Sequence, residues 1–126
     1  MQCSRGRAAL SYIVLSRDEF RSDELSTSAN FEGYPHNDTN VSFIWVDLPP
    51  GDGPRLRQHP YEEVFIVLEG HVTFTVDAAT IAATVGQVHI APPNTPHKFV
   101  NSGDGPLRQI DIHASKRFIT EWLEDE

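Results

Sequence analysis

The sequence of 126 residues predicts a single all-β domain, closed as a sandwich or barrel, that ends in a short helix. From residue 41 onward, short runs rich in Val, Ile, Phe and Thr follow one another closely. Turn residues such as Pro49-Pro50 and Pro92-Pro93 separate these runs. Many short strands with Gly and Pro between them favour two packed sheets over a βαβ arrangement.

The first three predicted strands differ in how their two faces are patterned. Val41–Leu48 is ended by two prolines and a glycine. Val64–Leu68 is apolar on both sides of its pleat, so we expect both faces of this strand to be covered. His71–Asp77 alternates apolar and polar residues, which predicts one buried face.

The remaining strands and the two flanking segments complete the predicted domain. Further strands are predicted at Thr80–Val85, Gln87–Ala91, His97–Ser102 and Leu107–Ala114, so that the barrel core spans about 41–114. Apolar residues at helical spacing, with Ser115 as N-cap, predict a helix over 115–126. The polar segment 18–40 is predicted to form an ordered loop over the barrel mouth, and Asp18–Leu25 within it is compatible with a helical turn.

Composition and charge argue against several classes of protein. The net charge of −8, with no cluster of Lys and Arg, argues against a nucleic-acid partner. No apolar stretch is long enough to span a bilayer, so no membrane partner is expected. Cys3 is the only cysteine, and Ala8–Leu15 is interpreted as a strand because it is short for a signal peptide and no cleavage pattern follows. We therefore expect a cytoplasmic protein.

Two segments resemble the two conserved motifs of the cupin family. Residues 51–70 read GDGPRLRQHPYEEVFIVLEG and residues 86–101 read GQVHIAPPNTPHKFVN. They are similar to the patterns G-x5-H-x-H-x3-4-E-x6-G and G-x5-P-x-G-x2-H-x3-N, in order and at the spacing of small microbial cupins. The resemblance implies a jelly-roll barrel, also called a double-stranded β-helix.

The motifs also imply a metal site, with one important departure. Arg57 stands where the first metal-binding histidine of the family belongs, so the resemblance leaves His59, Glu63 and His97 as the ligands of a divalent metal ion (Fe, Mn, Zn, Ni or Cu). Asn94 replaces a turn glycine, a mild change because Asn tolerates the left-handed backbone conformation.

The residues themselves predict that Glu63 is buried and needs a partner. Glu63 shares a strand face with Phe65 and Val67, and His97 shares one with Phe99. A buried, unpaired carboxylate is costly, so Glu63 must meet a metal ion, Arg57 or a proton.

A metal ion and Arg57, as partners of Glu63, predict different functions for the protein. A metal ion with open coordination positions suits an oxygenase or an isomerase that binds a small organic molecule in the barrel. An Arg57 fork on Glu63 would instead close the site, as in a non-catalytic binding or sensing cupin that has lost its metal. A purely structural dimer module is a third alternative.

The predicted substrate-binding residues are Arg57, Tyr61, Phe99 and His36. Arg57 suits a carboxylate or phosphate on an anionic ligand, which could bridge the arginine and the metal. Packing is the alternative role for Tyr61, and a surface position is the alternative for His36. His113 alternates with Ile110 and Ile112, and we predict that it lies on a wet face.

The resemblance further implies a homodimer. The alternate face of Val64, Ile66 and Leu68 is apolar and needs a cover, which a second subunit commonly provides in small cupins.

Overall fold

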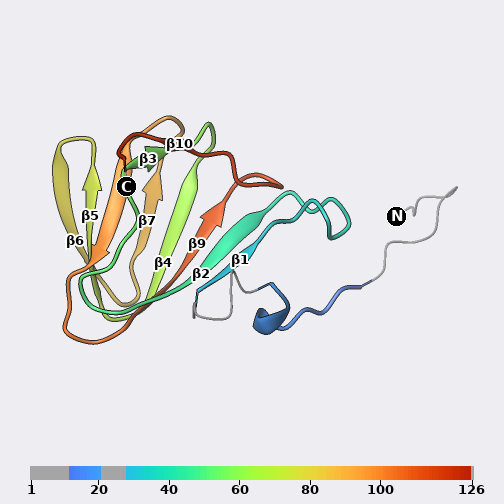
Figure 1. Ribbon diagram of the computed structural model, residues 1–126, viewed down its shortest axis with the longest axis horizontal. Helices are drawn as coiled ribbons and strands as arrows, with labels where there is room; N and C mark the ends of the chain where they lie inside the picture. Colours follow the sequence, from blue (N-terminus) through green and yellow to red (C-terminus); the bar gives the residue numbers. More distant parts are fainter. Residues whose placement is uncertain (1–11, 21–27, 126) are drawn as a thin grey trace, which may run out of the picture.

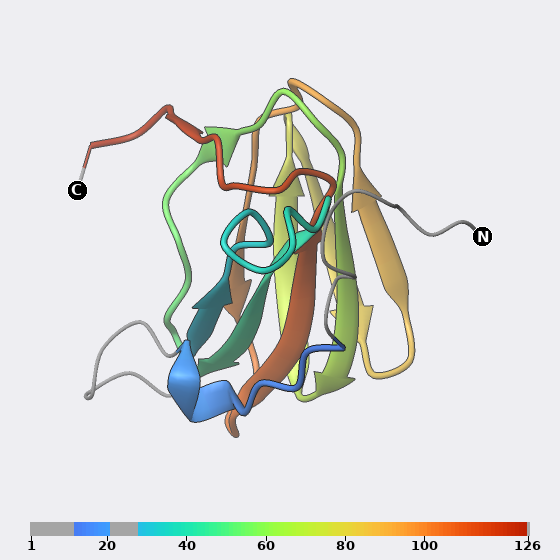
Figure 2. The same cartoon turned by 90° about the vertical axis from the view of Figure 1, so that its right-hand side faces the viewer.

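The computed structural model, which describes residues 12–20 and 28–125, consists of two five-stranded antiparallel sheets packed face to face (Figures 1 and 2). The strand order is β1-β2-β9-β4-β7 in the first sheet and β10-β3-β8-β5-β6 in the second. The predicted all-β jelly-roll class is confirmed. Bounds of the elements are η1 Arg17–Glu19, β1 Ala29–Phe31, β2 Ser42–Leu48, β3 Arg57–Gln58, β4 Glu63–Glu69, β5 His71–Val76, β6 Ala79–Thr84, β7 Val88–Ala91, β8 His97–Asn101, β9 Leu107–His113 and β10 Glu121–Trp122.

Two turns have backbone conformations that restrict which residue type can occupy them. Gly70 joins β4 to β5 with φ of +94°, and a Cβ atom there would lie 2.4 Å from the carbonyl oxygen of Pro106. Asn94 adopts φ of 58°, so it takes the left-handed conformation expected at this position of the second motif. Its backbone N–H donates to the carbonyl of His59 at 2.7 Å, which fixes the turn beside the candidate site.

The hydrophobic core fills one part of the space between the sheets. Phe65 from the first sheet meets Phe74 and Phe99 from the second at ring-centroid distances of 4.9 and 6.1 Å. All three rings are at most 4% exposed. This aromatic cluster anchors strands β4, β5 and β8, which carry or adjoin the two motifs.

The predicted C-terminal helix is wrong. Over 115–125 the chain runs extended along the barrel and forms only β10, which pairs with β3 (Figure 1). Its backbone groups find partners in neighbouring segments, including Tyr61 for the N–H of Ile119 and the carbonyl of Leu56 for the N–H of Leu123. A helix of so few residues is marginal by itself, and these tertiary hydrogen bonds outweigh its propensity.

The predicted loop over 18–40 is also partly wrong, because Ala29–Phe31 forms β1 and pairs with β2 at the sheet edge. The segment that follows does lie against the C-terminal segment, since the N–H of Tyr34 donates to the carbonyl of Lys116 at 2.9 Å (Figure 2). Residues 1–11 and 21–27 lie outside the described residues, and with them the first half of the predicted strand Ala8–Leu15; the other half, residues 12–15, forms neither helix nor strand.

The outward face of the first sheet is apolar. Paired positions of β2, β9, β4 and β7 form two cross-strand rows on this face: Phe43, Ile112, Val64 and Ile90, and Trp45, Ile110, Ile66 and Val88. Val88 is 58% exposed and Ile90 67% exposed. Within the described residues no helix is long and apolar enough to cross a membrane.

Candidate metal centre

Four strands bring their polar ends together at one end of the barrel. Glu63 is the first residue of β4, His97 is the first of β8, and His113 is the last of β9. Glu63 is directly opposite His113 in the sheet register, and Arg57 of β3 is opposite His97. His59 follows β3, so the tight turn leading to β4 places it near Glu63.

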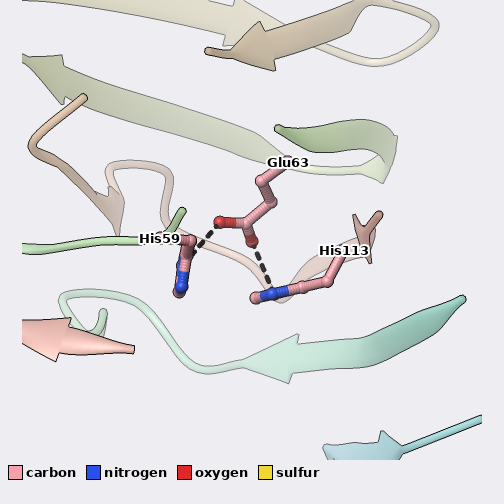
Figure 3. Close-up of side chains that lie close together, drawn as sticks. All are labelled: His59, Glu63 and His113. Atoms are coloured by element: carbon pink, nitrogen blue, oxygen red, sulfur yellow. Dashed lines mark ion pairs between the residues drawn. The ribbon is translucent and has the colours of Figure 1, made fainter. Parts of the chain in front are cut away.

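The carboxylate of Glu63 is the centre of this cluster. Its Oε1 atom lies 2.9 Å from Nε2 of His97 and 3.1 Å from Nε2 of His59. Its Oε2 atom lies 3.1 Å from Nε2 of His113. Figure 3 shows the carboxylate between the rings of His59 and His113. All four residues are at most 3% exposed, so water does not screen the interactions between them.

Each imidazole is held in place through its other ring nitrogen. Nδ1 of His59 donates to the carbonyl of Ile119 at 2.9 Å, and Nδ1 of His97 donates to the carbonyl of Thr95 at 2.8 Å. Because a carbonyl oxygen only accepts, Nδ1 carries the proton in both rings. In the neutral form, Nε2 of each ring therefore presents a lone pair to Glu63.

Tyr61 orients the third imidazole. Its hydroxyl lies 2.7 Å from Nδ1 of His113 and accepts a hydrogen bond from the N–H of Ile119 at 3.1 Å. The Tyr61 ring also stacks on that of His59, with centroids 5.2 Å apart. Burial raises the pKa of Tyr61, which keeps this hydroxyl protonated. Such outer contacts fix the direction in which a ligating imidazole points.

Several buried atoms at the centre have no hydrogen-bond partner among the described residues. They include Nε2 of His59, Oε2 of Glu63 and Nε2 of His113. His59, Glu63 and His113 also place one ligand atom each within 4.8 Å of one another. Unpaired buried polar atoms are costly, and a cation among them would engage all three. The residues present therefore fit a metal ion.

The electrostatics favour a charged carboxylate at Glu63. Burial of Glu63 raises its pKa, but the imidazoles of His113, His59 and His97 outweigh this and bring it well below the ordinary value. Burial is the largest influence on His113 and lowers its pKa, although Glu63 acts in the opposite direction. An ionised carboxylate and neutral imidazoles are the forms that bind metal ions.

Arg57 enters the same space without closing it. Its side chain is buried, and its Nη2 atom lies 3.8 Å from Oε2 of Glu63, too far for a hydrogen bond. The guanidinium carbon lies 5.4 Å from the ring centre of Phe99, and the Nη1 atom has no hydrogen-bond partner among the described residues. The bidentate fork onto Glu63 that the sequence left open is not formed.

A cavity of about 460 Å³ opens next to the cluster. Arg57, His59 and His113 line its polar end together with Asp111. The remaining lining includes these apolar side chains: Ile44, Val46, Leu48, Phe99, Phe118 and Trp122. Volumes of this size are typical of sites for small organic molecules.

Asp111 is an unusual acid in the cavity wall. It is 1% exposed, and its Oδ1 atom accepts a hydrogen bond from Nε2 of Gln109 at 2.8 Å. Burial, followed by the charge of Glu63, raises the pKa of Asp111 well above its ordinary value. The carboxyl group therefore tends to keep its proton at pH values where an exposed aspartate is charged.

The structure brings most of the predicted site residues together. His59, Glu63 and His97 converge, and Arg57 and Phe99 line the cavity beside them. Tyr61 lies behind His113, away from the cavity lining. His36 stacks on Phe31, with ring centroids 5.1 Å apart, and is not among the described residues that line the cavity. Substrate contacts by Tyr61 and His36 stay predictions.

The predicted wet face for His113 is wrong. His113 is 2% exposed and Gln109 is completely buried, because the polar side of β9 points into the barrel. Period-two alternation shows that two faces differ but does not show which one is inside. The neighbouring sequence held one signal: Ile110 and Ile112 resemble the apolar alternate residues of β4, with which they pair on the outer face.

This barrel with a polar cluster at one end is that of a cupin, and the family comparison agrees. The cupin domain model matches residues 44–113, so the chain belongs to the cupin family. The HTH-type transcriptional regulator PuuR of Escherichia coli is 28% identical over 111 residues, which cover 84% of this chain and 58% of the regulator. The uncharacterized protein MJ1618 of Methanocaldococcus jannaschii is 36% identical over 62 residues, 48% of this chain and 50% of that protein.

Solved structures show the same fold at low sequence identity. Oxalate decarboxylase from Bacillus subtilis superposes with a TM-score of 0.69 at 22% identity, covering 76% of this chain and 27% of the decarboxylase. The chain thus spans about half to three-fifths of the curated relatives and about a quarter of the enzyme.

Proposed function

We propose that the protein binds a divalent metal ion and a small organic ligand inside the barrel. The observation that carries the proposal is the convergence of His59, Glu63 and His113, whose facing ligand atoms are buried and lack hydrogen-bond partners within residues 12–20 and 28–125. Without a cation, two buried lone pairs at His59 and His97 face the same oxygen of Glu63. One proton relieves only one of these contacts, whereas a metal ion relieves both.

The proposed ligands are His59, Glu63 and His97, as the motifs imply, with His113 as a fourth. Nε2 of His113 faces Glu63 at 3.1 Å and compensates for Arg57, which cannot coordinate a cation. Imidazole and carboxylate ligands suit Fe, Mn, Zn, Ni and Cu. A metal ion bound by these residues would supply Lewis-acid or redox chemistry, of the kind used by oxygenases and isomerases, beside the cavity that His59 and His113 line.

Elemental analysis of protein purified without an immobilised-metal column tests the metal site. We expect about one divalent ion per chain, as for a single site with three or four ligands. Glu63→Ala and His59→Ala should lose the ion, and His71→Ala, at an exposed histidine, should retain it. Wild-type protein that stays metal-free after incubation with each of the five ions would overturn the proposal.

A second candidate function is ligand sensing without catalysis. The similarity to PuuR, a transcriptional regulator, over 84% of this chain favours it. In this function the barrel binds the same small molecule, but no substrate is consumed. Incubation of metal-loaded protein with a bound ligand, followed by mass spectrometry, separates the two: an unchanged ligand supports sensing, and turnover supports an enzyme.

We also propose that the outward face of the first sheet forms a homodimer. The exposed side chains of Val88 and Ile90 continue an apolar surface across four strands. Such faces are usually covered in solution. Sedimentation analysis should show a dimer for the wild type and a monomer for Ile90→Lys. Val100→Lys, on the other sheet, serves as the control. A monomeric wild type would contradict the proposal.

A further inference from the structure

Arg57 is a buried cation that has an acid nearby but no hydrogen-bonding anion among the described residues. The residue is 4% exposed, and its Nη1 atom has no hydrogen-bond partner in the part of the chain that the structure describes. Its nearest acid is Glu63 at 3.8 Å, whose carboxylate is already shared among three imidazoles. A buried guanidinium with a free N–H is costly unless an anion reaches it. Because Arg57 lines the cavity, a ligand can do so.

The charges at this end of the cavity call for an anion. A divalent ion contributes two positive charges and Arg57 one, against one negative charge on Glu63, so about two remain in excess. Even if Asp111 is ionised, one positive charge remains. Asp52, the other acid in the lining, is exposed to water at the rim. An anionic group on the ligand therefore complements the polar end.

The rest of the cavity calls for an apolar group. Val46 and Phe99 are 4% exposed and belong to the hydrophobic core, and Ile44 and Leu48 pack against it. Trp122 lines the cavity and is 50% exposed, so it lies near the opening. A volume of about 460 Å³ leaves room for a carbon chain or ring beyond the charged group. Water against such a lining is displaced favourably by apolar surface.

We propose that the ligand is a monocarboxylate with an apolar body, whose carboxylate binds Arg57 and whose body packs between Phe99 and the wall formed by β2. This inference rests on the proposed function for the metal but names the ligand class that the same cavity accepts. It sets this chain apart from the decarboxylase of similar fold, since oxalate is a small dianion without an apolar group. Oxalate would leave the wall of β2 in contact with water.

Calorimetric titration with matched probes tests the ligand class. Octanoate has both a carboxylate and an apolar chain. The alcohol 1-octanol has the chain without the charge, and acetate and oxalate have the charge without the chain. We expect octanoate to bind at least about tenfold more tightly than the other three, since each lost feature costs about one order of magnitude. In a Trp45→Phe background, a change in Trp122 emission should accompany binding, because Trp122 is then the only tryptophan and lines the cavity.

Variants separate the contributions of charge and body. Arg57→Gln should weaken octanoate at least about tenfold and leave 1-octanol unchanged, whereas Arg108→Gln, an exposed control with the same charge change, should alter neither. Val46→Phe, which fills the apolar end, should weaken octanoate but not acetate and keeps the test open if Arg57→Gln does not fold. Equal octanoate affinity in Arg57→Gln, or oxalate that binds as tightly as octanoate, would overturn the inference.

Titration of chelated and Mn²⁺-loaded protein distinguishes the two proposals. In one outcome the wild type prefers octanoate, Arg57→Gln loses this selectivity, and yet the wild type binds no metal ion. Such a result supports the ligand class and refutes the metal site. Bound metal without such selectivity refutes the ligand class alone.

Discussion

Strands β5 and β9 both turn one face into the barrel, but the inward residues of β5 are apolar whereas most of those of β9 are polar. The inward residues Val72 and Phe74 of β5 are apolar and 1% exposed. The inward face of β9 carries Gln109, Asp111 and His113, which are equally buried. The inward residues of β5 therefore stabilise the fold, whereas these three inward residues of β9 are polar and build the site.

The difference shows where this barrel tolerates an energetic cost. Oε1 of Gln109 and Nε2 of His113 are buried without hydrogen-bond partners among the described residues. Each such atom costs about 1–3 kcal/mol unless a ligand or ion engages it. The aromatic cluster of β4, β5 and β8, which joins the two sheets, offsets that cost. Changes on the two strands should therefore separate stability from binding.

The largest effect on stability is expected at Phe74. Phe74→Ala removes a buried ring that contacts Phe65 and Phe99, and should lower the free energy of unfolding by about 3–5 kcal/mol. The metal content per folded chain should not change. Val100→Ala, at a residue 37% exposed, should cost about 0.5 kcal/mol or less. Urea unfolding and elemental analysis measure both quantities; loss of metal in folded Phe74→Ala would contradict the division of roles.

His113 should show the opposite behaviour. His113→Ala should lower metal affinity about 10–100-fold, as loss of a ligand or its support does, and should destabilise the chelated protein less than Phe74→Ala does, because it also removes a buried nitrogen that has no hydrogen-bond partner among the described residues. Adding Arg57→His to this variant restores a third imidazole, and thus a fourth ligand, at the position where the family has one, and should recover part of the affinity. Tyr61→Phe, which removes the contact with Nδ1 of His113, should weaken binding about tenfold.

Competition with a chelator of known affinity measures these changes. Unchanged metal affinity in His113→Ala would leave the motif residues as the complete ligand set and assign His113 to packing.

The motif residues could be predicted from sequence, whereas the residues that complete the site could not. His59, Glu63 and His97 follow from a spacing that strands β4 and β8 translate directly into convergence. His113 is distant in sequence, and alternation along β9 gives no sign of which face is inside. The C-terminal segment was misassigned because its partners, such as Leu56 and Tyr61, lie far away in sequence. Which face of β9 is buried, and whether the C-terminal segment forms a strand, depend on contacts between residues distant in sequence, and only the structure shows these contacts.

The smallest expected effect is on the pH dependence of the free energy of unfolding, to which Asp111 and His113 contribute with opposite sign. Burial raises the pKa of Asp111 above the ordinary value of 3.8, so the folded chain binds more protons there than the unfolded chain. This contribution lowers stability as pH rises from about 3.8 to the folded pKa. His113, with its pKa lowered below 6.5, acts in the opposite sense and lowers stability as pH falls through 6.5 towards the folded pKa.

Asp111→Asn removes the first contribution while its amide oxygen can still accept from Gln109. In chelated protein the variant should be more stable than the wild type by about 1 kcal/mol at pH 8, because it contains no buried charge there. The difference should shrink towards pH 4, as the unfolded chain also begins to bind a proton at Asp111 near the ordinary pKa of 3.8. Urea unfolding across this range, with the exposed Asp52→Asn as control, measures the slope. An advantage that grows as pH falls would show that Asp111 is an ionised, stabilising member of the polar face, and β9 would then resemble β5 in supporting the fold.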